Sequence, residues 1–254
     1  MDDLKGKTAI VTRASRGIGA ATARELAGLG VNVVLVARSE GEIAGIADEI
    51  LKSGGKAAAV AADVARYEDV QAAVDTAVER FGGLDILVNN AGLIEPIAHL
   101  AESDPAAWDL VVDVNLKGVY HGLRAALPVM VGQGAGVVVN ISSGAATSAM
   151  EGWSHYCATK AAVLSLTRCA DKEVGDKGVR IVGLSPGTVA THMQVAIRAS
   201  GINPVSQLDP SVHIPPEWAA RAIAWLASDA AADIRGEDFV LREEANRRRV
   251  GLPA

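Results

Sequence analysis

Short apolar runs alternate with longer amphipathic segments along the whole chain. Seven runs, rich in β-branched residues, have the length of buried strands: TAIVT (8–12), NVVLVA (32–37), KAAAVAAD (56–63), LDILVNNA (84–91), GVVVNISS (136–143), VRIVGLS (179–185) and DFVLR (238–242). Between them lie segments with helical periodicity, such as AATARELAGLG and EDVQAAVDTAVERF. This rhythm predicts an α/β fold, a doubly wound parallel sheet of seven strands flanked by helices on both faces.

A single domain is expected over residues 1–254, because α/β folds of this size commonly form one unit and no linker or repeat interrupts the pattern. The longest stretch without strand or helix signals is 188–216, which contains four prolines. Such a stretch is too long for a simple connection. We therefore expect it to form a lid over a substrate pocket.

Composition narrows the class of protein further. Half of the residues are hydrophobic but only 4% are aromatic, which suits a core of aliphatic strands. The net charge of −6 and the lack of a dense basic face argue against nucleic acid or a membrane as partner. Cys157 and Cys169 offer no metal-ligand cluster, and the N-terminus lacks the apolar run of a signal peptide. We expect a cytoplasmic protein without a metal site.

The segment TRASRGIG joins the first predicted strand to the first helix. Backbone N–H groups at such a helix start attract phosphate, and the residues placed to form this cradle are Ser15, Arg16, Gly17, Ile18 and Gly19. Glycines here can also serve only to pack the helix against the strand. Arg13 stands where such a turn usually has glycine.

The end of the second strand bears on the choice of cofactor. An NAD site usually has a carboxylate about 20 residues beyond the glycines, but Arg38 occupies that place. Ser39 and Glu42 have the spacing of a helix capping box. Arg38 and Arg16 are suited to a ribose 2′-phosphate, although either alone could be a solvated surface residue. The sequence thus predicts NADP(H) as cofactor.

A second group of residues suggests catalysis. Ser143 follows a predicted strand, and Tyr156 and Lys160 share one helix face at spacing i, i+4. A lysine charge about 4 Å from a phenol is worth roughly 4 kcal/mol at an effective dielectric constant of about 20, close to 3 pKa units. We expect Lys160 to bring the Tyr156 pKa near neutrality, where a general acid works best. Singly, each residue also has a purely structural explanation.

Taken together, these motifs resemble those of the short-chain dehydrogenase/reductase superfamily, in its short single-domain branch, over Leu4 to about Asp238. TRASRGIG is similar to its TGxxxGxG cradle and YCATK to its YxxxK motif, with NNAG (89–92), VNLKG and SPGTVAT (185–191) in the family's order. Ser143 lies 13 positions before Tyr156, as the family's catalytic serine does. Length and cradle are closer to 3-oxoacyl reductases, whereas the loop THMQVAIRASG (191–201) resembles that of sepiapterin and benzil reductase-like members, and neither resemblance decides the substrate.

The resemblance implies a Rossmann fold and reversible reduction of a ketone or aldehyde. Tyr156 would transfer the proton, Lys160 would tune Tyr156 and hold the nicotinamide ribose, Ser143 would orient the carbonyl, and Asn115 would hold a water of a proton relay. Further cofactor contacts would come from Asp63, Val64, Asn90, Ala91, Gly92, Pro186, Gly187, Val189 and Thr191. The family also implies a homo-oligomer, a dimer or tetramer.

Two departures from the family pattern bear on these expectations. The Arg13 side chain could strain the turn, enter the adenosine groove, or reach the phosphates, and we expect weakened but surviving cofactor binding. The tail GEDFVLREEANRRRVGLPA lacks the family's Asp-Gly-Gly turn, which puts the tetramer arrangement in doubt. Its arginines 247–249 are expected on a solvated helix face.

The substrate is not determined by the sequence, although a pocket is expected around Leu93, Ile94, Ala145, Met150, Trp153 and Met193. Ordinary packing explains each of these residues equally well. A serine hydrolase using Ser143 and His155 is disfavoured, because no G-x-S-x-G elbow surrounds the serine. A catalytically silent NADP(H)-binding regulator remains the alternative.

Overall fold

The computed structural model describes residues 1–253 and contains one sheet of seven parallel strands in the order β3-β2-β1-β4-β5-β6-β7. The strands are β1 (Thr8–Thr12), β2 (Asn32–Ala37), β3 (Lys56–Ala61), β4 (Ile86–Asn89), β5 (Gly136–Ile141), β6 (Val179–Ser185) and β7 (Asp238–Val240). All seven coincide with predicted runs, although four of them end earlier than the runs do. The α/β fold, doubly wound with a seven-stranded parallel sheet, is confirmed.

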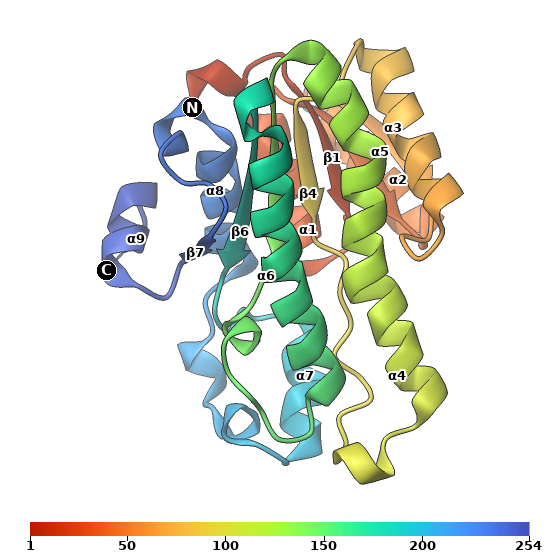
Figure 1. The fold of residues 1–254 in the computed structure, drawn as a ribbon. Coiled ribbons are helices and arrows are strands. Elements are labelled where there is room, and N and C mark those ends of the chain that lie inside the picture. The colour runs from red at the N-terminus through yellow and green to blue at the C-terminus, as the bar shows by residue number, and fades with distance from the viewer. Residues whose placement is uncertain (254) are drawn as a thin grey trace.

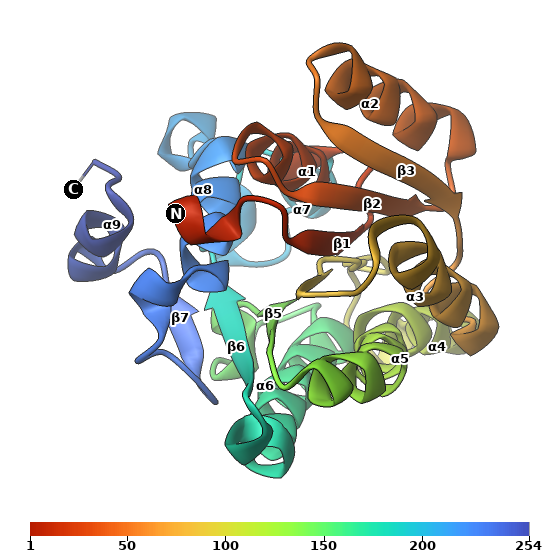
Figure 2. The ribbon, with the colours of Figure 1, turned by 90° about the horizontal axis from the view of Figure 1, so that it is seen from above.

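Helices cover both faces of the sheet (Figures 1 and 2). One layer contains α1 (Gly17–Gly28), α2 (Glu40–Lys52) and α8 (Pro216–Ala227), and the other contains α3 (Tyr67–Phe81), α5 (Gly118–Gln133) and α6 (Ser154–Val174). The strands serve both cores by alternation. In β2, Val33 and Leu35 pack toward the first layer, whereas Val34 and Val36 pack toward the second. This explains why the strand is continuously apolar.

The sheet order reverses between β1 and β4, because the chain first adds β2 and β3 on one side and then returns to the other. Ligands of doubly wound sheets bind in the crevice at the carboxyl ends of strands beside such a reversal. The motifs TRASRGIG, NNAG, ISS and SPGTVAT follow β1, β4, β5 and β6, respectively. The fold thus brings all four to one edge.

The stretch 188–216 is more ordered than the sequence indicated. It contains α7 (His192–Ser200) and two 3₁₀ turns, Pro204–Gln207 and Pro210–Val212, and Val189 pairs with Ile214 in an isolated bridge. The expectation of an irregular segment was therefore wrong. The prolines fall outside α7, so their turn signals concealed a short helix within the stretch.

One other helical feature differs from expectation, and a second was not addressed by the sequence analysis. The Ser39 side chain makes no capping hydrogen bond to α2, so the expected capping box is wrong. In the second feature, α4 (Pro105–Val112) continues through a π-helical turn, Asp113–Lys117, directly into α5. Figure 1 shows the result as one long rod.

The C-terminal helix α9 (Glu244–Val250) lies beside α8 at the edge of the molecule. Arg248 and Arg249 are exposed, as expected for a solvated helix face, whereas Arg247 is half-buried. Arg248 pairs with Glu244, but Arg249 binds Asp233 at 2.9 Å and lies 5.0 Å from the Trp225 ring centroid. Within residues 1–253, no helix is both long and apolar enough to span a membrane.

Candidate active site

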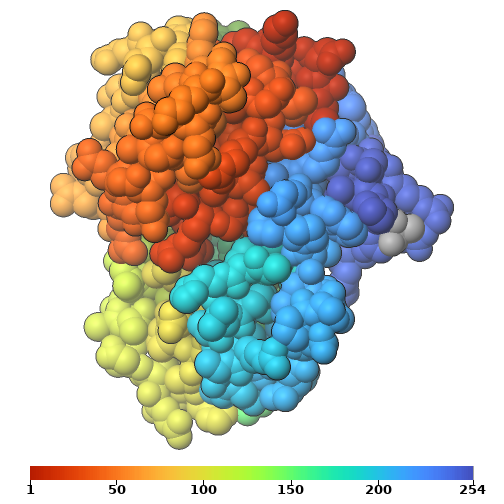
Figure 3. All heavy atoms as spheres, turned by 180° about the vertical axis from the view of Figure 1, so that it is seen from behind, coloured from red at the N-terminus to blue at the C-terminus, as the bar shows by residue number. Residues whose placement is uncertain are grey.

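A cleft of about 1710 Å³ opens at the carboxyl edge of the sheet, between the cradle after β1 and the segment that carries α7. Figure 3 shows the red N-terminal part and the cyan α7 segment facing each other across this side of the molecule. Thirteen residues predicted for the site line the cleft: Arg13, Arg16, Gly17, Ile18, Asn90, Gly92, Ser143, Tyr156, Lys160, Pro186, Gly187, Val189 and Thr191.

The cradle has the geometry that a phosphate requires. Gly17 begins α1 with φ of +54°, a conformation that side chains disfavour. A Cβ at Gly19 would overlap the carbonyl oxygen of Arg13. No side chain caps the N-terminus of α1, so its first N–H groups are not satisfied by a cap. The residues present therefore fit the phosphate of a dinucleotide.

Arg13 crosses the groove beside this cradle. Its φ is +52°, and its Nη1 donates a hydrogen bond of 2.6 Å to the carbonyl oxygen of Gly92. Burial lowers the pKa of the guanidinium, and the charges of Arg16 and Arg38 lower it further. Within residues 1–253 none of these three arginines forms a salt bridge. The site thus concentrates positive charge without a protein counter-ion.

The other predicted cofactor contacts do not line the cleft. Asp63 accepts a hydrogen bond from the Ala65 N–H at 3.0 Å, and Val64 is buried against the position of Gly118. Ser15 borders a neighbouring hollow between α1 and α8. The other predicted cofactor residues that lie outside the main cleft are Gly19, Arg38, Asp63, Val64 and Ala91. In this conformation they support the cradle or lie beside it.

Tyr156 and Lys160 lie in the first and second turns of α6, respectively, and both border the cleft. Tyr156 is 8% exposed, and the Lys160 Nζ lies 5.6 Å from the centroid of its ring. Lys160 donates a hydrogen bond of 2.6 Å to the carbonyl oxygen of Ile141, at the end of β5. The two side chains therefore face one space, as the i, i+4 spacing predicted.

The expected electrostatics of this pair were wrong. Burial raises the pKa of Tyr156, while an interaction with the Ser143 hydroxyl and the positive charge of Arg13 oppose the rise. Burial also lowers the pKa of Lys160 to about 8, against the charge of Asp238, which raises it, and with that of Arg13, which lowers it further. The estimate from the sequence assumed a partly solvated pair of side chains. In the structure, the loss of solvation on burial dominates both pKa values.

Ser143 and Asn115 complete the set. The Ser143 Oγ accepts a hydrogen bond from the Ala145 N–H at 3.2 Å, which fixes it at the end of β5. Both polar atoms of the buried Asn115 side chain bind the Leu93 backbone, at 2.7 and 2.9 Å. His155 instead binds the Ile94 carbonyl at 2.7 Å, apart from Ser143.

An apolar chamber adjoins Tyr156. The ring of Trp153 meets the Tyr156 ring edge-on, with centroids 5.7 Å apart. Other side chains of this cluster come from the loop after β4, from the segment after β5 and from α7; they are Ile94, Ile97, Ala145, Met150, Met193 and Ile197. Of the expected pocket residues, only Leu93 belongs to a different cluster, the one packed between the sheet and α3, α5 and α6.

The sequence did not identify several polar residues of the cleft. Asp238 begins β7, and its carboxylate accepts a hydrogen bond of 2.5 Å from Ser142. His192, His213, Arg242 and Arg247 also line the cleft, from the α7 segment and the C-terminal region. No local motif marks them, because their positions depend on how distant segments pack.

Known proteins resemble this chain over most of its length. Residues 7–201 match the short chain dehydrogenase family. A 3-oxoacyl-[acyl-carrier-protein] reductase of Synechocystis is 37% identical, with 94% of this chain and 96% of the relative covered. A 3beta-hydroxysteroid dehydrogenase 1 of Eggerthella lenta is 40% identical, with 92% of each covered.

A solved structure, that of levodione reductase, superimposes with a TM-score of 0.87 at 29% identity and covers 93% of this chain and 96% of its own. The likeness in sequence and the likeness in structure thus extend over the same fold. The chain belongs to the short-chain dehydrogenase/reductase family of oxidoreductases, which use nicotinamide cofactors.

Proposed function

We propose that this protein is an NADP(H)-dependent oxidoreductase that reversibly reduces a ketone or aldehyde to an alcohol. The observation that carries the proposal is the convergence of Ser143, Tyr156 and Lys160 on a cleft that begins at a phosphate cradle. When bound, the nicotinamide supplies or accepts the hydride. The side chains of the protein then have to bind the carbonyl oxygen and transfer a proton to or from it.

Tyr156 is the group that gives its phenolic proton to the carbonyl oxygen during reduction, and it takes the proton back during oxidation. Its deprotonation is costly in a buried site, so nearby positive charge matters. Lys160 and Arg13 supply that charge at the cleft. Ser143 is placed to donate a hydrogen bond to the same oxygen as charge develops on it.

NADP(H) is favoured over NAD(H) by the arginines at the cradle. Arg16 and Arg38 influence the pKa of Arg13 and have no carboxylate partner among residues 1–253, so they are available to a 2′-phosphate. No carboxylate stands at the end of β2, where an NAD site usually holds the ribose hydroxyls.

For the substrate, we favour a carbonyl on an apolar body. The chamber beside Tyr156 is formed mainly by Ile, Met, Ala and Trp side chains. The names of two relatives, which refer to a 3-oxoacyl thioester and a 3beta-hydroxysteroid, both describe carbonyl or hydroxyl groups on large apolar frames.

One observation favours the second candidate, a catalytically silent NADP(H)-binding regulator. The Arg13 side chain lies across the groove between the cradle and Gly92, where a dinucleotide reaching Tyr156 has to pass. Cofactor binding in the productive position therefore requires Arg13 to leave Gly92. A protein in which it stays would bind cofactor poorly and not turn over.

The test is a panel of cyclic ketones, 3-oxoacyl thioesters and aldehydes, assayed for oxidation of NADPH and NADH. Tyr156→Phe should lower kcat by at least about 10²-fold, because the proton donor is lost, while the dissociation constant of NADPH stays within about twofold. Retained turnover in this variant would end the assignment of Tyr156. Cofactor binding without turnover of any carbonyl would favour the silent regulator.

A further inference from the structure

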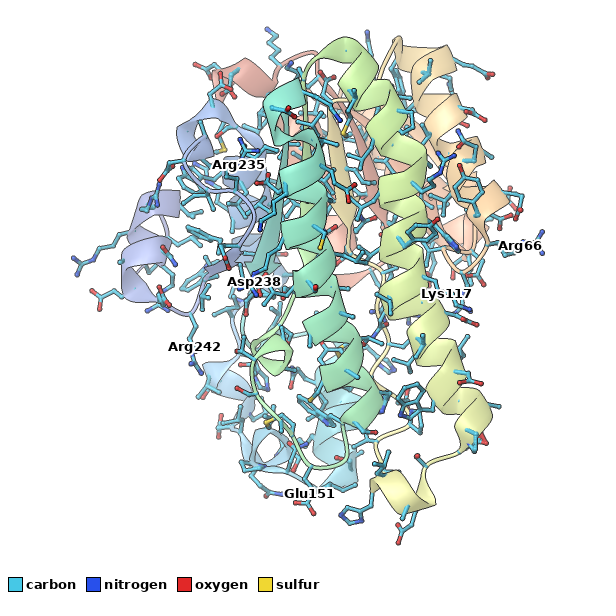
Figure 4. All side chains as sticks on the ribbon, viewed as in Figure 1. Arg66, Lys117, Glu151, Arg235, Asp238 and Arg242 are labelled. Carbon is cyan, nitrogen blue, oxygen red and sulfur yellow. The ribbon has the colours of Figure 1, made fainter. Side chains whose placement is uncertain are left out.

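The carboxylate of the half-buried Asp238 is a group that the proposed chemistry does not use. Asp238 starts β7, and Figure 4 shows it beside α6, the helix that carries the catalytic pair. Its Oδ2 accepts a hydrogen bond of 2.5 Å from the Ser142 hydroxyl, and its Oδ1 is buried without a partner in the described structure. A buried polar atom without a hydrogen-bond partner costs free energy.

The neighbouring strand makes room for this carboxylate. Residue 183 of β6 pairs with Asp238 in the sheet, and a Cβ there would collide with the Asp238 Oδ1. Only glycine at this position allows the carboxylate to lie over β6. The sheet therefore accommodates the charge, which argues against an accidental surface group.

Asp238 is linked through Ser142 to both Lys160 and Ser143. Ser142, its hydrogen-bond partner, stands between Ile141, whose carbonyl accepts the Lys160 hydrogen bond, and Ser143. Three consecutive residues at the end of β5 thus bind Asp238, fix Lys160 and present Ser143. A shift of Ser142 would move both neighbours, because they share its peptide bonds.

The charges around Lys160 and Asp238 can be assigned to their elements. Asp238 on β7 faces Lys160 and Arg168 of α6 and the preceding Glu237, while Arg13 from the β1–α1 turn also acts on Lys160. Arg168 pairs with Glu237 at 2.8 Å near the surface. Burial raises the pKa of Asp238, whereas the Ser142 hydrogen bond and the charge of Lys160 lower it, so the carboxylate and the ammonium group favour each other's charged forms.

We propose that Asp238 is a positioning residue of the active site: through Ser142 it fixes the end of β5, which holds Lys160 and Ser143, and its carboxylate is the acidic group that acts on Lys160. This inference rests on the proposed function only for its effect on turnover. Asp238 itself touches neither the carbonyl nor the cofactor in this role. Its effect on Lys160 can be measured without either.

The first experiment is Asp238→Asn, which keeps an oxygen acceptor for Ser142 and removes the charge. In protein labelled with ¹³C-lysine, the NMR titration of the Lys160 Cε, assigned with Lys160→Arg, should move down by about one pH unit. Glu237→Gln is the matched control, since it removes a charge one residue away at the surface. A midpoint that does not move, or that moves no more than in the control, overturns the proposal.

The second experiment is Ser142→Ala, which removes the hydrogen bond to Asp238 but keeps the carboxylate of Asp238. We expect kcat to fall about tenfold with the NADPH dissociation constant unchanged, because Ser143 is less well placed. Ser142→Thr, which restores a hydroxyl, should recover most of that loss. Full kcat in Ser142→Ala, or no recovery in Ser142→Thr, overturns the proposal.

These measurements separate the inference from the proposed function. If the wild-type protein reduces no carbonyl, the proposed function fails, while the Lys160 titration still decides whether Asp238 acts on it. If Asp238→Asn does not fold, as judged by circular dichroism, the Ser142 pair carries the test.

Discussion

Arg13 combines two unusual properties at a single residue. Its backbone has φ of +52°, in the left-handed region, and its guanidinium is turned inward to bind the Gly92 carbonyl. The backbone conformation costs a residue with a side chain roughly 1–2 kcal/mol relative to glycine. Of the possibilities considered, the structure shows the strained turn, and the side chain lies in the cleft toward Gly92.

Replacement of Arg13 by glycine should therefore tighten cofactor binding. Arg13→Gly removes both the strain and the obstruction, so we expect the NADPH dissociation constant to fall by about tenfold or more, which corresponds to about 1.4 kcal/mol. Fluorescence titration of NADPH measures it. Arg13→Ala is the control, because it keeps the strained backbone but clears the groove. A weaker or unchanged affinity in Arg13→Gly would contradict the obstruction.

Lys160 determines the expected pH dependence. Burial lowers its pKa from the usual 10.5 to about 8, so the ammonium form is complete below that value and disappears as the pH rises through it. Carbonyl reduction needs this charge beside Tyr156. We expect kcat/KM for the carbonyl to be constant on the acid side of pH 8 and to decline up to about tenfold per pH unit above it. A profile that stays flat to pH 10 would show that Lys160 does not titrate in this range.

At the scale of elements, local sequence patterns were sufficient to predict the strands but not the structure of residues 188–216. β2 was predicted to the residue, because an apolar β-branched run between polar turns has few alternative structures. α7 was missed because the prolines around it dominate the local pattern. The approach of Asp238 to Ser142, 96 residues apart, depends on the pairing of β6 with β7 and has no local signature.

The same limit applies to the candidate site. The spacing of Tyr156 and Lys160 on one helix was enough to predict that they share a space, whereas their pKa values depend on burial, which spacing does not reveal. The direction of the Arg13 side chain also depends on Gly92, 79 positions away. Residue types and periodicity therefore identified the candidate site residues, and packing determined their pKa values.

The helix α7 should control the fit of the substrate. Ile197 is 2% exposed and packs into the chamber beside Tyr156, so Ile197→Ala enlarges the chamber and loosens the helix. We expect KM for an apolar ketone to rise by about tenfold, with NADPH affinity unchanged. Steady-state kinetics test this, with Val195→Ala as control on the same helix, where the side chain is 61% exposed. Equal effects in the two variants would mean that α7 does not contact the substrate.

The whole molecule is organised around the edge where the strands end. Both core clusters lie on the sheet, and the chamber cluster lies beyond it, toward α7 (Figure 1). The homo-oligomer implied by the family stays a prediction. Leu110 and Tyr120, which are 45% and 51% exposed, are on the α4–α5 rod that a helix-to-helix dimer would use.

Because the cleft joins the β1–β4 edge to α7, a cofactor should stabilise the molecule as a whole. A ligand at 100 times its dissociation constant stabilises the native state by about 2.7 kcal/mol. For a chain of this size, that raises Tm by about 5–10 °C. At equal concentrations NADPH should raise Tm more than NADH does, because the 2′-phosphate meets Arg16 and Arg38. Arg38→Ala should reduce that difference without changing the Tm of the free protein, since Arg38 is exposed. Equal shifts by the two cofactors in the wild-type protein, measured by differential scanning fluorimetry, would contradict the preference for NADP(H).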